Sequence, residues 1–131
     1  MELTIDQSLQ RGVAAHKAGN LNEADKFYTA ILKAQPQHPD ANHNMGVLAV
    51  SIGKVREALP YFKVALEANP AIEQFWLSYI DALIKLERFN DARELLKKAR
   101  SSGLMGDQVD QLEAQVNAFS KQEVDSNQHP T

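Results

Sequence analysis

Residues 42–70, NHNMGVLAVSIGKVREALPYFKVALEANP, decide the fold, because their small residues, large residues and prolines recur elsewhere in the chain. The repeat distance is 34 residues, and it separates Gly12 from Gly46, Gly19 from Gly53, Ala24 from Ala58, and Pro36 from Pro70. A third copy continues at Ala92 and Leu96. A fixed period of this length indicates stacked helical hairpins, each of which buries its apolar face only against its neighbours.

The repeated residues resemble the tetratricopeptide pattern W-x2-L-G-x2-Y, A-x3-F and a terminal proline. In the second copy those slots hold Asn42, Met45, Gly46, Ala49, Ala58, Phe62 and Pro70, in the first Ser8, Arg11, Gly12, Ala15, Ala24, Tyr28 and Pro36, and in the third Trp76, Tyr79, Ile80, Leu83, Ala92 and Leu96. The resemblance implies an all-α fold, a right-handed α-α superhelix (TPR-like solenoid) of about seven helices.

We expect one repeat domain over residues 1–122, with repeats at 5–38, 39–72 and 73–106 and a capping helix at 107–122. The expected first helices of the repeats span 4–18, 40–52 and 73–86, and the second helices span 21–34, 55–68 and 89–101. The capping helix is indicated by an apolar stripe of Val109, Leu112, Val116 and Phe119 with a polar opposite face. Residues 123–131 lack a hydrophobic period and are expected to form a disordered tail or linker.

The turns within the repeats carry Gly19, Gly53 and Glu87. Glycine suits the left-handed position that follows a helix, whereas glutamate does not, so the third turn is expected to differ. Asn20 followed by Glu23 resembles a capping box at the start of a second helix.

Composition excludes several classes of function. The chain has 14 basic and 17 acidic residues and a net charge of −3, which argues against a nucleic-acid partner. No apolar run is long enough to span a membrane, and the N-terminus lacks a secretion signal, so we expect no membrane association and a cytoplasmic location. Cysteine is absent, which removes disulfides and thiolate chemistry.

We find no sequence signature of catalysis, and we expect no enzyme activity, no cofactor and no metal. The nucleophile, zinc-protease, phosphate-loop and dinucleotide motifs do not occur. His16 and His43 fall about two helical turns apart in the repeat, roughly 10 Å, and therefore cannot share a zinc ion.

The resemblance places an inner groove on the first helices of the repeats, where relatives bind polypeptide segments. Apolar side chains there supply contact area, and amides can bond a peptide backbone. The candidate peptide-binding residues are Leu9, Gln10, Val13, Lys17, His43, Asn44, Val47, Ser51, Leu77, Ser78, Asp81 and Lys85.

One subclass of the family clamps the acidic C-terminus of heat-shock chaperones with lysine, arginine and asparagine. The matching positions here are Leu9, Val13, Asn44, Gln74 and Ser78, of which only Asn44 fits. Without the cations a terminal carboxylate would be held poorly, so we predict a different ligand.

The sequence therefore predicts a protein–protein interaction module that binds a protein or peptide segment in the concave groove. We expect a monomer, with a homodimer as the alternative. A second hypothesis stays open: the chain resembles repeat regions that recruit substrates or partners at the N-terminus of bacterial glycosyl-, sulfo- or methyltransferases.

Overall fold

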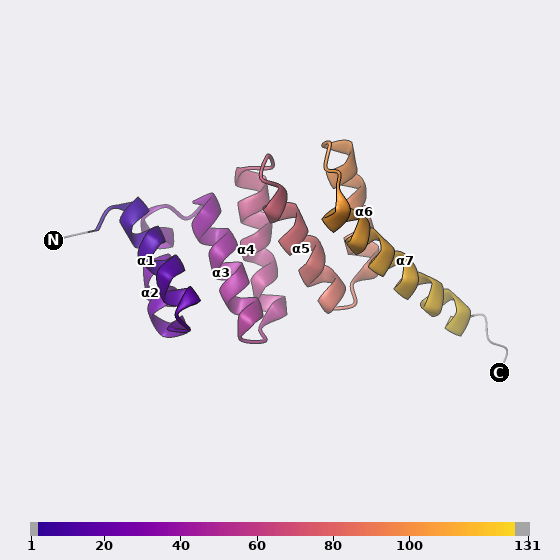
Figure 1. Ribbon diagram of the computed structural model, residues 1–131, viewed down its shortest axis with the longest axis horizontal. Helices are drawn as coiled ribbons and strands as arrows, with labels where there is room; N and C mark the ends of the chain where they lie inside the picture. Colours follow the sequence, from indigo (N-terminus) through magenta and orange to yellow (C-terminus); the bar gives the residue numbers. More distant parts are fainter. Residues whose placement is uncertain (1–2, 128–131) are drawn as a thin grey trace. The chain divides into compact units, whose positions relative to one another are not determined.

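The computed structural model describes the backbone of residues 3–127 and the side chains of residues 3–119. Over this range every regular element is an α-helix, as the sequence predicts (Figure 1). The helices are α1 (Ile5–Lys17), α2 (Leu21–Ala34), α3 (Pro39–Ser51), α4 (Val55–Ala68), α5 (Glu73–Lys85), α6 (Phe89–Ser101) and α7 (Asp107–Asn127). The chain divides within α5 into two compact units, residues 1–75 and 76–131, and each is described by itself.

The first unit contains two helical hairpins, α1 with α2 and α3 with α4, and α2 also packs against α3. A cluster of buried side chains joins the hairpins: Ala15, Ala24, Tyr28, Met45 and Leu48. The repeated glycines Gly12 and Gly46 lie where the two helices of each hairpin approach closely. A Cβ atom on Gly12 would lie 2.5 Å from Cε1 of Tyr28, and one on Gly46 would overlap the ring of Phe62.

The second unit takes its core from the end of α5, from α6 and from α7. Its fully or almost fully buried side chains are Ile80, Ala92, Leu96, Ala99, Val109 and Val116. The apolar stripe expected on the capping helix packs inward at Val109, Leu112 and Val116. Phe119, at the end of the stripe, is 41% exposed and stacks on Phe89 with ring centroids 4.9 Å apart.

The last helix is longer than the expected capping helix. α7 continues to Asn127, past the predicted boundary at residue 122, because residues 123–127 contain no proline or glycine to stop it. Only residues 123–127 of the expected tail fall within the described backbone, and residues 128–131 lie outside it.

The turn at Glu87 does not differ from the glycine turns, contrary to the sequence-based expectation. Glu87 adopts a positive φ of 58°, beside 83° at Gly19 and 81° at Gly53. The same backbone hydrogen bond closes both helices. Arg88 N–H donates to Leu83 O at 2.9 Å, and Asn20 N–H donates to Ala15 O at 2.8 Å. This Schellman pattern of helix closure imposes a left-handed backbone conformation on the residue that follows the helix, whatever its side chain.

The capping box expected at Asn20 and Glu23 is also wrong. The Asn20 side chain makes no capping hydrogen bond, because its ψ of 73° departs from the extended backbone that a cap requires. A complete capping box is present instead at the start of α1, where Thr4 Oγ1 accepts from Gln7 N–H at 3.1 Å and Gln7 Oε1 accepts from Thr4 N–H at 3.0 Å.

Candidate peptide-binding face

In the first unit, eight of the candidate residues come from two neighbouring helices, α1 and α3. We call this set the α1–α3 face: Leu9, Gln10, Val13, Lys17, His43, Asn44, Val47 and Ser51. Leu9, Val13, His43, Asn44 and Val47 are half-buried, whereas Gln10, Lys17 and Ser51 are exposed. The accessible part of the face therefore combines aliphatic surface with amides, a hydroxyl and a single lysine.

Local hydrogen bonds fix the start of α3. His38 is the N-cap, and its Nδ1 accepts from Ala41 N–H at 3.1 Å, while Pro39 occupies the first turn. Asn42 is 3% exposed, and its Nδ2 donates to Pro36 O at 3.0 Å and to His38 O at 2.8 Å. These bonds hold the preceding loop against α3, immediately before the residues of the face.

This anchoring role of Asn42 was not predicted from the sequence. The one available signal was a small polar residue in the slot where the family pattern has tryptophan, and it did not reveal the loop carbonyls that the amide meets.

His43 is the most constrained residue of the α1–α3 face. Its ring packs against Phe75 and Phe62, with centroid distances of 4.9 Å and 5.7 Å. Burial lowers the pKa of His43 below its ordinary 6.5, and a hydrogen bond with Asn44 and the charge of Asp40 oppose that shift in part. The ring is therefore neutral near pH 7.

The remaining four candidates belong to the second unit. Leu77 is 6% exposed, so its side chain belongs to the core and offers almost no contact surface. Ser78 and Asp81 are half-buried, and Lys85 is exposed and forms an ion pair with Asp81 one turn earlier on α5. The charge of Lys85 is therefore already paired with that of Asp81 within the chain.

The described part of the chain holds no group of three histidine, aspartate or glutamate side chains arranged to bind a metal ion. None of its helices combines the length and the apolar character needed to cross a bilayer.

Comparison with known proteins agrees with this architecture. Two family models described as tetratricopeptide repeat match the chain, one over residues 49–116 and the other over residues 9–38. A search of curated proteins found no match.

Solved structures give the same fold. The complex of the TPR2B domain of yeast Sti1 with pHsp70 superposes with a TM-score of 0.79 at 20% identity, covering 88% of this chain and 97% of that one. The TPR domain of Arabidopsis OM64 gives a TM-score of 0.78 at 17% identity, covering 88% and 95%. The first TPR of Spaghetti (RPAP3), bound to the HSP90 peptide SRMEEVD, gives 0.76 at 17% identity, covering 88% and 93%. These structures are similar in fold, and the predicted all-α, TPR-like class is confirmed.

Proposed function

Because the chain belongs to the tetratricopeptide repeat family, we propose that it is a protein-interaction module whose α1–α3 face binds a peptide or protein segment. The observation that carries the proposal is that Leu9, Val13, Asn44 and Val47 are half-buried on two helices that contact each other. Half-buried side chains are held in place by their core contacts, yet part of their surface stays accessible to a ligand. Such preorganisation lowers the entropy cost of binding.

The chemistry of the face favours a largely uncharged segment. Its aliphatic side chains supply apolar contact area, and the amides of Gln10 and Asn44 can bond the backbone of an extended peptide. Lys17 is its one cation, and the acidic side chains of Asp6 and Asp40 are exposed on the same two helices. An acidic C-terminal peptide would therefore meet too little positive charge to be held tightly.

The test is selection of a displayed library of random 12-residue peptides against the purified chain, followed by titration of the enriched peptides. Val47→Asp adds a charge to the proposed contact surface and should weaken binding at least about tenfold. Lys63→Asp is the matched control, because Lys63 is exposed on α4 outside the α1–α3 face, and it should change affinity less than about twofold.

Two further outcomes bear on the proposal. Titration with the acidic peptide SRMEEVD should leave the amide NMR shifts of α1 and α3 almost unchanged, since that peptide needs cations that the α1–α3 face lacks. Amide NMR shifts that change on α1 and α3 upon peptide addition would support the location. Full binding by Val47→Asp, with shifts confined to other helices, would overturn it.

A further inference from the structure

A cleft of about 540 Å³ lies between α6 and α7 in the second unit. Its walls are one stripe from each helix: Arg93, Leu96, Lys97, Arg100 and Ser101 from α6, and Glu113, Val116 and Asn117 from α7. The α6 residues follow the helical spacing of three and four, so the cleft runs along the helix axis. The volume is within the range that holds a bound side chain or a short peptide motif.

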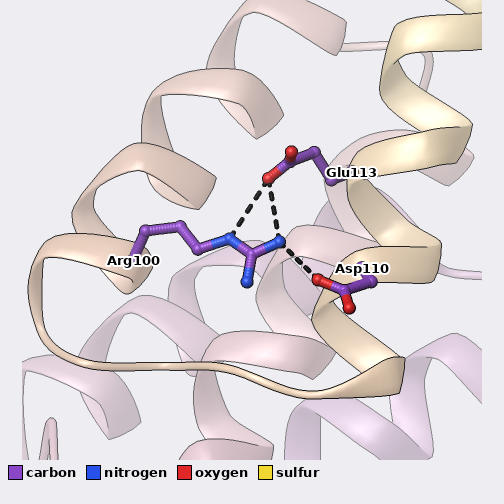
Figure 2. A network of polar contacts seen from close by, with 3 residues as sticks. All are labelled: Arg100, Asp110 and Glu113. Atoms are coloured by element: carbon purple, nitrogen blue, oxygen red, sulfur yellow. Dashed lines mark hydrogen bonds and ion pairs between the residues drawn. The ribbon is translucent and has the colours of Figure 1, made fainter.

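The charges around the cleft are unevenly compensated. Arg100 is held by two acids of α7: its Nη2 lies 2.6 Å from Asp110 Oδ1 and 3.1 Å from Glu113 Oε2, and its Nε donates to Glu113 at 3.2 Å (Figure 2). Arg100 offsets one of these two negative charges, and the bonds raise the pKa of Arg100, chiefly through the hydrogen bond with Asp110.

Within residues 3–119, two cations of the α6 wall have no acidic partner. Arg93 donates to the neutral Asn90 Oδ1 at 2.9 Å. Among the side chains that the structure describes, Lys97 forms no ion pair, and it is exposed. Three cations against two acids leave a small excess of positive charge around the cleft, in a chain whose net charge is −3.

Leu96 and Val116 lie at the bottom of the cleft but are 3% and 1% exposed, so most of the apolar surface open to a ligand comes from the aliphatic stems of the lysine and arginines along the wall. We propose that this cleft is a second docking surface, separate from the α1–α3 face, for an acidic peptide segment that places an apolar side chain against those stems. Carboxylates on either side of that side chain would meet Arg93 and Lys97. Charge complementarity then sets partner choice and association rate.

The same features argue against a nucleic acid. Binding of a phosphate backbone depends on many cations, whereas this cleft has two that are uncompensated. Single-stranded nucleic acids also stack their bases on aromatic side chains, and the described residues that line the cleft include no aromatic one.

The experiment uses a displayed library of random 12-residue peptides, selected on the full chain with Val47→Asp so that the α1–α3 face contributes little. The enriched peptides should combine glutamate or aspartate with one leucine, isoleucine, valine or phenylalanine. We expect Lys97→Glu to weaken them at least about tenfold, and an increase in salt from about 0.05 M to about 0.5 M to weaken them further.

Lys98→Glu is the matched control, because Lys98 is the next residue of α6, is exposed and does not line the cleft. It should change affinity less than about twofold, as should Val47→Asp on the α1–α3 face. Enriched peptides without excess acid, or equal losses from Lys97→Glu and Lys98→Glu, would overturn the proposal. So would a concentration-dependent dimer in sedimentation that Lys97→Glu abolishes, since a second copy would then be the occupant.

Discussion

Gly12 lies so close to the ring of Tyr28 that a Cβ atom on the glycine would be 2.5 Å from Cε1 of the tyrosine. Tyr28 is 1% exposed and cannot move aside without disturbing the core. The same relationship recurs one repeat later between Gly46 and Phe62. Close approach of the two helices in each hairpin therefore depends on the absence of a side chain at these two positions.

Gly12→Ala is expected to lower the free energy of unfolding by about 1 kcal/mol. Overpacking costs about 1–3 kcal/mol, and the better helix propensity of alanine offsets about 0.5–1 kcal/mol of that loss. Urea denaturation at 25 °C measures the difference. Ala14→Gly, at an exposed position of α1, calibrates the propensity contribution. If the Gly12→Ala protein is as stable as the wild type or more stable, the Tyr28 ring can accommodate the added methyl group.

Glu87→Gly is expected to raise the free energy of unfolding by about 0.5–1 kcal/mol. Glu87 has a left-handed backbone that costs a residue with a Cβ atom about 1–2 kcal/mol, and glycine removes that cost while losing some entropy on folding. Thermal and urea unfolding should both report the gain. Gly53→Ala is the mirror control and should destabilise, since a Cβ there meets open space and only the backbone is strained. A destabilised Glu87→Gly protein would contradict the argument.

Much of the fold was predictable because it depends on residues that recur at one period. The second helices begin and end where the repeat places them, and Gly12 and Gly46 have the packing role that small residues indicate. The conformation of Glu87 was not predictable from its own preference, because the hydrogen bonds that close α5 override it.

The candidate binding face was predictable only in part. The repeat spacing of the family identified the helices that carry the candidate residues. The burial of each side chain, however, depends on its contacts in three dimensions. Leu77 is 6% exposed although its spacing matches that of Leu9, which is half-buried. The acceptors of the Asn42 amide lie in the preceding loop and in the first turn of α3, and no periodicity of the sequence specifies them.

Asn42→Ala is expected to lower the free energy of unfolding by about 1–3 kcal/mol. The substitution removes two hydrogen bonds and leaves the carbonyl groups of Pro36 and His38 without the amide donor. Chemical denaturation measures the loss. Asn22→Ala, at an exposed position of α2, should stay within about 0.5 kcal/mol of the wild type. Equal effects of the two substitutions would show that the Asn42 amide does not anchor the loop.

Acid should destabilise the first unit through His43. Because burial lowers the pKa of the folded state below the ordinary 6.5, protons bind the unfolded chain more readily. The stability associated with the neutral ring is complete above pH 6.5 and is lost as the pH falls below 6.5 toward the lowered folded-state value. His43→Gln removes the titrating group, so its stability should fall less than that of the wild type between about pH 7.5 and about pH 5. Urea denaturation across this range compares the two proteins, and an NMR titration of the His43 ring should give a pKa below 6.5. Parallel pH profiles for the two proteins, or a ring pKa at or above 6.5, would show that the contacts with Phe62 and Phe75 do not disfavour the charged ring.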